Sequence, residues 1–423
     1  MKVIYLEKAI LIGLDKINDK NFHESMLELS NLAFACDVEV LHIITQKRNK
    51  PTANFYVGEG KVHEIKEAIN TFDADLIIFN DELSPSHIKN LEKALDIKVI
   101  DRTVLILDIF AKRAKTKEAM LQVELAQAKY YLPRIVGMYK HLSKQKSGTG
   151  SKGPGEQQLE LDKRLLRNKI SHLKKELNQI VKTRRIQREK RKKNDVFTVT
   201  LTGYTNSGKS TLMNAIITMV SNHNDYYAFN KNMLFATLET KTKKIHLDNN
   251  HNFLLTDTVG FIDKLPHHLI EAFKSTLEEI LEASIILHVI DVSNKNYENQ
   301  ILIVEQVLES IGVKNIPIIY VYNKVDLLKD IPPSTKDNSI FISAKDGYHI
   351  SQLLEMIDYE LYRTINNVKM LIPFTKSNVY SDLKNNANIL STKYLNNGIY
   401  IEVEVNKKYL NKYIEYVKIT KEK

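Results

Sequence analysis

The sequence has a single cysteine and no long apolar run, and both absences narrow the classes of protein it can belong to. Cys36 is the only cysteine among 423 residues, so no intramolecular disulfide can form. We expect it to be a small buried apolar residue and not a reactive thiol. No apolar run approaches the ~20 residues of a membrane span. The longest runs, such as Ile316 to Tyr322, have the length of a strand.

A signal peptide is not indicated either. The first residues, MKVIYLEKAILIGLD, carry Glu7 and Lys8 inside their apolar stretch and offer no small-residue cleavage site. The hydrophobic content of 43% is ordinary for a globular protein, and the length allows two to four domains. We therefore expect a cytoplasmic monomer with no integral membrane association.

Basic residues are concentrated in one fifth of the chain. Between Ile106 and Lys193 there are 24 Lys and Arg but only 8 Asp and Glu, a net charge of +16, while the whole chain carries +10. A solvated basic face is the ordinary explanation of such a run. An excess larger than that of the entire chain, confined to one segment, favours a polyanionic partner.

One stretch near the middle of the chain carries the strongest chemical signal. Val196 to Leu201 is rich in β-branched residues, which predicts a buried strand, and an amphipathic helical pattern begins at about Leu212. Between them the chain fits G-x-x-x-x-G-K-[ST]. Its glycines let backbone N–H groups point inward, and the helix N-terminus favours negative charge, so the loop can hold a polyphosphate. The expected nucleotide-binding residues are Gly203, Tyr204, Thr205, Asn206, Ser207, Gly208, Lys209, Ser210 and Thr211.

Two residues of this loop have specific chemical roles. Lys209 would reach the β- and γ-phosphates, and the Ser210 hydroxyl would ligate Mg²⁺. The alternative is a strand–helix turn that matches the pattern by accident. The strand and the helix on either side argue against that alternative.

Three further motifs each follow a predicted strand. They are Asp257, Thr258, Val259 and Gly260 after Asn252–Thr256; Asn323, Lys324 and Asp326 after Ile316–Tyr322; and Ser343, Ala344 and Lys345 after Ser339–Ile342. An Asp at a strand end can hold Mg²⁺ through water, and the Gly260 N–H can contact a γ-phosphate. Open α/β sheets bind ligands at the carboxyl ends of their strands, so this order indicates a single nucleotide site.

The rest of the chain divides around this nucleotide domain, which we place at residues 194–365. Residues 1–105 alternate strand and helix patterns, which predicts a parallel sheet covered by helices. Residues 366–423 contain Pro373, a helical pattern around Leu383 and an alternating strand pattern from Gly398 to Val405, so we expect a small α+β domain there. The expected fold class is therefore α/β with additional helical and α+β parts.

Residues 106–193 have a different pattern. Apolar residues recur at alternating spacings of 4 and 3 from Leu121 to Leu142 and again from Leu166 to Ile180, which predicts an antiparallel helical hairpin. Its tip matches the dinucleotide fingerprint G-x-G-x-x-G, but no strand precedes it. A polar, Lys-bearing tip on a basic hairpin is better suited to contact with RNA backbone, and a plain solvent linker is the alternative. The candidate RNA-binding residues are Gly148, Gly150, Lys152, Gly153 and Gly155.

The order of the four nucleotide motifs resembles that of the Ras-like P-loop GTPases. The resemblance implies that Asp326 pairs with the guanine N1 and N2 donors, that Asn323 braces the loop, and that Lys324 covers the base. It also implies that the Ser343-Ala344 turn contacts the guanine oxygen. The substrate would be GTP and the product GDP.

The same resemblance implies a switch I threonine that ligates Mg²⁺. Thr237 is the favoured candidate and Thr242 the alternative. The expected metal-binding residues are Ser210, Thr237 and, through water, Asp257; the expected catalytic residues are Lys209, Thr237 and Gly260. Phe261 stands where many such GTPases carry a glutamine that orients the attacking water, so hydrolysis by the free protein should be slow.

Longer motifs resemble one family within this class. DRTVLILDIFA from Asp101, LQVELAQ from Leu121, GPGE from Gly153, GYTNSGKST, FATL from Phe235 and DTVGFI together are similar to the HflX ribosome-associated GTPases. The resemblance implies binding to the large ribosomal subunit and its rRNA, splitting of stalled or stressed ribosomes, and GTP hydrolysis that the ribosome accelerates. Three places depart from the family pattern: Lys152, Gln157 and Glu239–Lys241.

Two other functions are compatible with parts of the sequence. A GTP-switched rRNA-binding adaptor, acting in ribosome assembly or hibernation, would bind RNA without splitting ribosomes. An ATP-driven motor would use the same phosphate loop, but the Asn323-Lys324-Val325-Asp326 motif opposes a preference for adenine.

Overall fold

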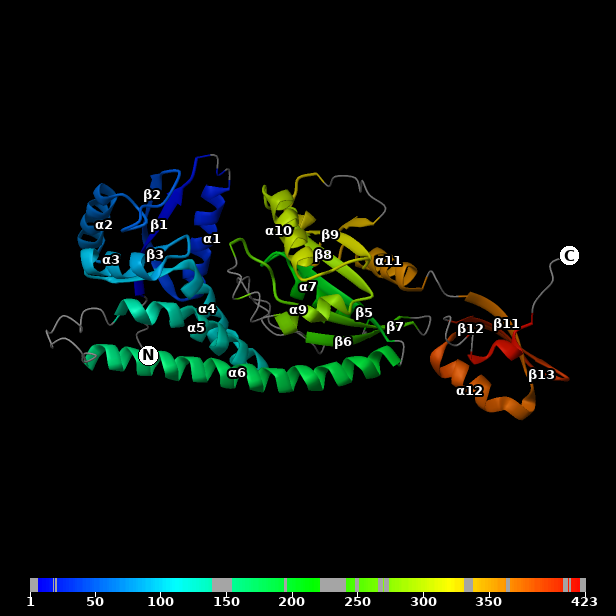
Figure 1. Cartoon of the computed structure of the whole chain (residues 1–423). Coiled ribbons are helices and arrows are strands. Elements are labelled where there is room, and N and C mark those ends of the chain that lie inside the picture. Colours follow the sequence, from blue (N-terminus) through cyan, green and yellow to red (C-terminus); the bar gives the residue numbers. More distant parts are fainter. Residues whose placement is uncertain are drawn as a thin grey trace, which may run out of the picture.

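The computed structural model describes residues 7–17, 19, 21–138, 154–193, 196–220, 241–247, 251–264, 269, 274–330, 338–362, 366–405, 410 and 412–418. Three β-sheets follow one another along the chain, and Figure 1 shows them spread along the length of the molecule. Across these residues no helix has both the length and the apolarity needed to cross a membrane. The expected α/β class is confirmed, because the two larger sheets are built from strands that alternate with helices.

The first sheet has four parallel strands in the order β2-β1-β3-β4. Its strands are β1 (Glu7–Asp15), β2 (Val38–Lys47), β3 (Leu76–Phe79) and β4 (Lys98–Asp101), and its helices are α1 (Phe22–Ala35), α2 (Glu59–Phe72) and α3 (Pro85–Leu95). The sequence prediction missed β1, which pairs with both β2 and β3. Six consecutive residues of β1 are buried, so its sequence is a continuous apolar run without alternation.

The first sheet and its helices form the first unit of the structure. α4 (Arg102–Arg113) belongs to this unit and not to the hairpin. The Asp101 carboxylate caps the helix by accepting a hydrogen bond from the Val104 N–H. The apolar side chains of α4 pack in the same core as α1 and β1. The boundary predicted between residues 105 and 106 therefore falls inside one helix, because α4 packs in the core of the first unit on both sides of that boundary. Cys36 lies in this core, where burial raises the pKa of its thiol to about 12.

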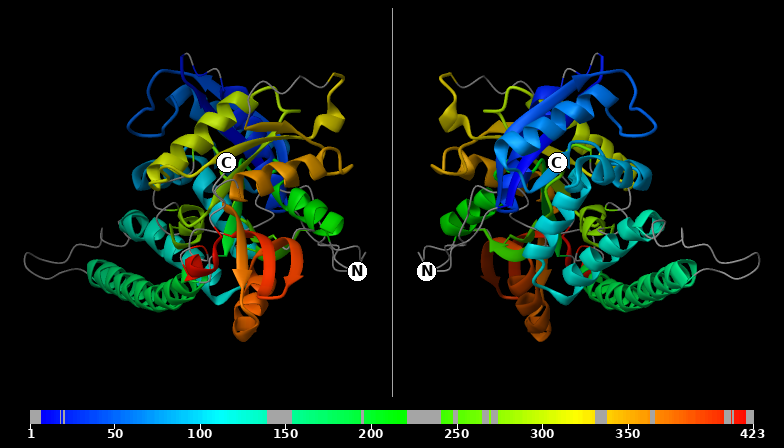
Figure 2. Two further views of the ribbon diagram at one scale, coloured as in Figure 1. Left: turned by 90° about the vertical axis from the view of Figure 1, so that its right-hand side faces the viewer. Right: turned by 90° about the vertical axis from the view of Figure 1, so that its left-hand side faces the viewer.

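The basic hairpin consists of α5 (Lys117–Met138) and α6 (Pro154–Lys193). The two helices share an apolar cluster of Leu121, Leu125, Leu173 and Leu177. Lys117 pairs with Glu176 at 3.2 Å, and Glu124 pairs with Lys169 at 2.6 Å. The later α5 residue, Glu124, contacts the earlier α6 residue, Lys169, so the two helices are antiparallel. α6 extends past α5 below the second sheet (Figure 1), and the hairpin projects to one side of the molecule (Figure 2).

The second sheet has six strands in the order β10-β9-β8-β5-β7-β6, and only the β6–β7 pair is antiparallel. The strands are β5 (Phe197–Gly203), β6 (Lys241–His246), β7 (Asn252–Asp257), β8 (Ile285–Asp291), β9 (Ile318–Asn323) and β10 (Ser339–Phe341). The helices are α7 (Lys209–Val220), α9 (Lys274–Leu281), α10 (Tyr297–Ser310) and α11 (Ile350–Tyr362). The carboxyl ends of the parallel strands meet at one edge, which is where such sheets bind ligands.

The third sheet is small and antiparallel, in the order β11-β13-β12. It consists of β11 (Asn366–Ile372), β12 (Asn388–Leu395) and β13 (Gly398–Val405), with α12 (Ser377–Asn386) packed on its core. His251 connects the third sheet to the second unit, which is the unit built on the second sheet. The His251 ring stacks on Tyr362, its Nδ1 lies 2.7 Å from Asp358, and its Nε2 lies 3.8 Å from Glu404 of β13.

The first and second units share an apolar core with a polar junction inside it. The Tyr204 hydroxyl donates to Glu28 Oε1 at 2.7 Å and accepts from the Asp263 N–H at 2.7 Å. Arg102, only 2% exposed, pairs with the other Glu28 oxygen and donates to Asn80 Oδ1 at 3.0 Å. The junction therefore joins α1 and α4 to the loop after β5. Burial raises the pKa of Glu28, and the Arg102 charge opposes that shift most strongly.

Arg102→Ala should destabilise the protein far more than loss of an exposed ion pair. The variant leaves the Glu28 carboxylate buried without its counter-charge, which costs about 3–5 kcal/mol of unfolding free energy. Lys112→Ala is the matched control, because the Lys112–Asp37 pair is 50% and 66% exposed and should contribute about 1 kcal/mol or less. Urea unfolding of both variants measures the difference. Equal losses of unfolding free energy would show that the buried pair contributes no more than the exposed pair.

Candidate functional site

The loop between β5 and α7 depends on two glycines. Gly203 has φ +146°, and a methyl group there would lie 2.2 Å from the Val289 carbonyl oxygen. Gly208 has φ +97°, and a methyl group there would lie 2.2 Å from Asn323 Nδ2. Both positions therefore exclude larger residues by space as well as by backbone conformation. The strand runs as far as Gly203 and the helix begins at Lys209, so the loop itself is short.

Gly208→Ala should weaken nucleotide binding by more than about tenfold. The added methyl group must displace Asn323, which links this loop to the motif after β10, and the backbone conformation adds strain of ~1 kcal/mol. Gly312→Ala is a matched control, because Gly312 has φ +93° but nothing within 4 Å of the added methyl group. Titration with a fluorescent GDP analogue compares the two. A Gly208→Ala affinity equal to that of Gly312→Ala would contradict the role of the Asn323 contact.

The lysine of the loop is buried among backbone oxygens. Lys209 Nζ donates to the Gly203 carbonyl at 3.1 Å and to the Tyr204 carbonyl at 2.7 Å. Burial lowers the pKa of Lys209 to about 8, and the nearby Asp257 carboxylate opposes the shift. Within the described part of the chain, the hydroxyls of Thr205 and Ser207 are buried without a hydrogen-bond partner. The loop thus contains a buried ammonium group and two buried hydroxyls without a partner, a set of donors that fits an anion.

Ser210 and Asp257 meet beside the loop although they are 47 residues apart. The Ser210 hydroxyl donates to Asp257 Oδ2 at 2.6 Å, because β5 and β7 are neighbours and α7 starts after β5. Hydroxyl and carboxylate oxygens are the hard ligands that Mg²⁺ prefers, so this pair fits that metal. Thr237 lies outside the described residues. Thr242 lies in β6, where its hydroxyl is 3.1 Å from that of Thr256.

The segment after β7 lies against the phosphate loop. The Phe261 N–H donates to the Gly203 carbonyl at 3.1 Å, and the Thr205 N–H donates to the Phe261 carbonyl at 2.7 Å. A methyl group on Gly260 would lie 2.9 Å from Lys209 Nζ and 2.9 Å from the backbone Cα of Thr205, so a larger residue would force the loop to shift. The Phe261 side chain is 2% exposed and packs in the core shared with the first unit. The hydroxyl of Thr258 is used internally, donating to the Leu201 carbonyl at 2.7 Å, and Val259 is buried.

The motifs after β9 and β10 are hydrogen-bonded to one another and to the phosphate loop. Asn323 Nδ2 donates to the Ser207 carbonyl, and Asn323 Oδ1 accepts from the Ala344 N–H, both at 2.9 Å. The Ser343 hydroxyl donates to Asp326 Oδ1 at 2.8 Å. Lys345 is exposed. One asparagine thus ties three strand ends together and places the Asp326 carboxylate at the same edge as the phosphate loop.

The sequence prediction overlooked Asp291, the last residue of β8. Its Oδ2 lies 2.6 Å from Lys324 Nζ. The signal that could have found it is the one that identified Asp257, an acidic residue at the end of a buried strand. Glu28 and Arg102 were overlooked as well, and no local pattern marks them as neighbours of Tyr204.

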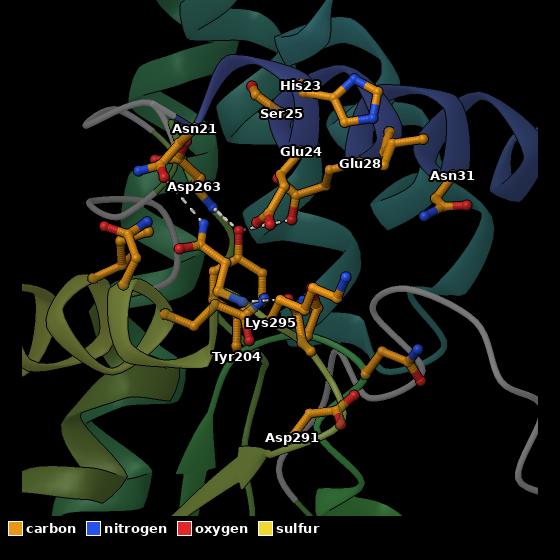
Figure 3. Close-up of a pocket in the computed structure, with 18 of the residues that line it drawn as sticks. Asn21, His23, Glu24, Ser25, Glu28, Asn31, Tyr204, Asp263, Asp291 and Lys295 are labelled. Atoms are coloured by element: carbon orange, nitrogen blue, oxygen red, sulfur yellow. Dashed lines mark hydrogen bonds between the residues drawn. The ribbon is translucent and has the colours of Figure 1, made fainter. Parts of the chain in front are cut away.

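A cleft of about 580 Å³ opens beside the phosphate loop. Tyr204, Thr205 and Asn206 form part of its wall, and α1 of the first unit contributes Glu24 and Glu28. Figure 3 shows the Tyr204 side chain between these carboxylates and Asp291. This cleft is therefore enclosed by two structural units and not by the second sheet alone. Among the candidate RNA-binding residues, only Gly155 lies in the described part of the chain, in the first turn of α6.

Comparison with known families assigns all three central segments. Residues 23–111 match a family model described as the N-terminal part of a GTP-binding GTPase, and residues 113–191 match its middle region. Residues 198–324 match a model described as a 50S ribosome-binding GTPase. The first two matches meet at the end of α4, where the structure also ends the first unit.

Individual relatives match over most of their length. GTPase HflX of Caldanaerobacter subterraneus subsp. tengcongensis is 46% identical over 94% of this chain and 91% of its own length. GTPase HflX of Escherichia coli is 41% identical over 87% of this chain and 86% of its own. A GTP-binding protein from Sulfolobus solfataricus, solved with GDP, is 26% identical over 85% of this chain and 99% of its own, with a TM-score of 0.44. With the phosphate loop in place and identity sustained over nearly the whole sequence, this chain belongs to the HflX family of GTPases.

Proposed function

We propose that this chain binds GTP with Mg²⁺, hydrolyses it to GDP and phosphate, and uses this cycle on the large ribosomal subunit to dissociate stalled or stressed ribosomes. The observation that supports the nucleotide part best is the convergence of four motifs. The phosphate loop, Asp257, the segment from Asn323 to Asp326 and the Ser343-Ala344 turn are connected by hydrogen bonds at one sheet edge.

In the proposed mechanism the chain holds the phosphates mainly through the loop and its lysine. Lys209 exchanges its two backbone carbonyl partners for oxygens of the β- and γ-phosphates, while the Gly260 N–H approaches the γ-phosphate. Ser210 and Asp257 would hold Mg²⁺, which when bound supplies positive charge at the phosphate oxygens. Thr237, from the region that the structure does not describe, would complete that ligand set.

Guanine specificity is proposed to come from Asp326. Its carboxylate accepts hydrogen bonds from the guanine N1 and N2 donors, a pattern that adenine does not offer. The Ser343 hydroxyl holds one carboxylate oxygen in place, so the acceptor geometry exists before the ligand arrives. Asn323 connects the segment that carries Asp326 to the phosphate loop, because its Nδ2 donates to the Ser207 carbonyl.

Hydrolysis by the free protein is proposed to be slow. Phe261 follows Gly260, but its side chain is packed in the core between the first two units. An apolar side chain cannot orient water through hydrogen bonds, so this position contributes nothing to placing the attacking water. The ribosome would then accelerate hydrolysis by completing the site or by moving the segment that carries Phe261.

The hairpin is proposed to supply much of the ribosome affinity. The segment from Ile106 to Lys193 carries a net charge of +16, and α6 exposes Arg164, Arg167, Lys169, Lys174, Lys175 and Lys182. Cations that displace counterions from RNA phosphates give affinity that falls steeply with salt. Residues 198–324 match the family of 50S ribosome-binding GTPases, which supports the same partner.

Replacing residues 147–155 with a short neutral linker should abolish splitting while leaving nucleotide binding intact. This tip contributes one charge, Lys152, so association with ribosomes at low salt should persist through the helices. Its glycines allow the unusual backbone angles that a close fit to folded RNA requires, and Pro154 limits the freedom lost on ordering. Light scattering of intact ribosomes, GTP affinity and co-sedimentation across a salt series measure the three properties. Splitting at the parent rate would make the tip a linker, and a parent protein that binds but never splits would favour the adaptor function.

A further inference from the structure

Asp291 makes two separate contacts at the edge of the second sheet. The side chain is 15% exposed and ends β8. Its Oδ2 lies 2.6 Å from Lys324 Nζ, whereas its Oδ1 accepts from both the N–H and the hydroxyl of Ser293. The two oxygens therefore serve different neighbours, and the two contacts can be removed one at a time.

The contact with Lys324 fixes a side chain that would otherwise be mobile. Lys324 has a left-handed backbone conformation, φ 69° and ψ 34°, directly after Asn323. Asp291 and Asn323 are register partners at the ends of β8 and β9. The ion pair therefore draws the Lys324 side chain across the end of β8. A lysine without such an anchor samples many rotamers and loses that freedom when a ligand orders it.

We infer that Asp291 is a positioning residue for the guanine nucleotide, which holds the ammonium of Lys324 so that its aliphatic part is ordered over the base site before binding. The inference rests on the proposed guanine site. Preorganisation of this kind reduces the entropy lost on binding. It acts equally on GDP and GTP, because both carry the same base, and it leaves the chemistry at the γ-phosphate unchanged.

A purely structural role for Asp291 gives different expectations. In that case the carboxylate only stabilises the turn between β8 and α10 through Ser293. Loss of Asp291 would then act independently of Lys324, and loss of the Ser293 hydroxyl would have part of the same effect. The Oδ1 contact with Ser293 therefore tests the structural role, and the Oδ2 contact with Lys324 tests the positioning role.

The test is a double-mutant cycle on the full chain. Asp291→Asn should weaken GDP and GTP binding by about fivefold each, the size expected for an ion pair that solvent still reaches in part, with kcat at saturating GTP unchanged. Lys324→Met keeps the aliphatic part and removes the charge, so it should show the same loss. The Asp291→Asn/Lys324→Met double variant should lie within about twofold of either single variant. Ser293→Ala, the control, should stay within about twofold of the parent.

Fluorescent GDP and GTP analogues measure these affinities, and melting curves check that each variant is folded. If the Asp291→Asn and Lys324→Met losses multiply in the double variant, or if Ser293→Ala reproduces the Asp291→Asn loss, the inference is wrong. Asp326→Asn in the same assay separates it from the proposed function. If Asp326→Asn weakens GTP binding but Asp291→Asn does not, only the inference fails. If Asp326→Asn has no effect, the guanine site itself is misassigned.

Discussion

Lys209→Ala should lower the rate of GTP turnover by at least about a thousandfold. Lys209 is the one buried ammonium inside the described phosphate loop, and its Nζ lies next to both the loop carbonyls and Gly260. Without it, the charge that develops on the β- and γ-phosphates in the transition state loses its closest cation from the chain. Phosphate release under saturating GTP and ribosomes measures the effect.

The loss should not come from unfolding. Burial lowers the pKa of Lys209 to about 8, so the folded state disfavours the charged form and gains from its removal. The variant should therefore melt close to the parent temperature. Lys329→Ala, an exposed lysine with the same change in charge, is the control and should keep parental turnover. Parental turnover in Lys209→Ala would mean that the phosphate loop is misassigned.

Asp326→Asn should weaken GTP binding by ~2–4 kcal/mol, about 30- to 1,000-fold, and should improve binding of xanthosine triphosphate. The amide replaces one acceptor by a donor, which faces the N1 and N2 donors of guanine but suits the oxygen of xanthine. The Ser343 hydroxyl can still donate to the remaining amide oxygen, so the loop should keep its shape.

Competition between GTP and xanthosine triphosphate measures this change of preference. Asp330→Asn makes the same chemical change at an exposed position four residues along the chain, and it should leave both affinities unchanged. A fall in GTP affinity without any gain for xanthosine triphosphate would indicate distortion of the loop and not loss of a specific pair. Unchanged GTP affinity would exclude Asp326 from base recognition.

The features that local sequence could predict are those with a repeating physical cause. Strands β7 and β9 were predicted because short apolar runs end in polar motifs, and the antiparallel hairpin because its apolar residues repeat at helical spacing. β1 is an apolar run as well, but it was missed because no polar motif of the nucleotide site follows it. The predicted boundary at residues 105/106 divides α4, because only the packing of this helix against α1 and β1 shows that it belongs to the first unit.

The parts of the site that could not be predicted are contacts across long separations. Arg102 and Glu28 are 74 residues apart, and Tyr204 and Glu28 are 176 apart. Nothing in the local pattern around Glu28 distinguishes it from any other helical glutamate, because its role is set by the packing of two units. Asp291 could have been predicted, because it is an acidic residue at the end of a buried strand, as Asp257 is. Its partner Lys324 belongs to a different motif, so only the structure pairs them.

The most direct test of the proposed function is sucrose-gradient sedimentation of 70S ribosomes with the parent protein and GTP, a non-hydrolysable GTP analogue, or GDP. We predict that the protein sediments with the large subunit, and that free subunits appear with GTP and with the analogue but not with GDP. We expect this because only GTP and the analogue carry the γ-phosphate that Lys209 and Gly260 are proposed to contact. Ribosomes that stay intact with GTP, or that separate equally well with GDP, would contradict this prediction.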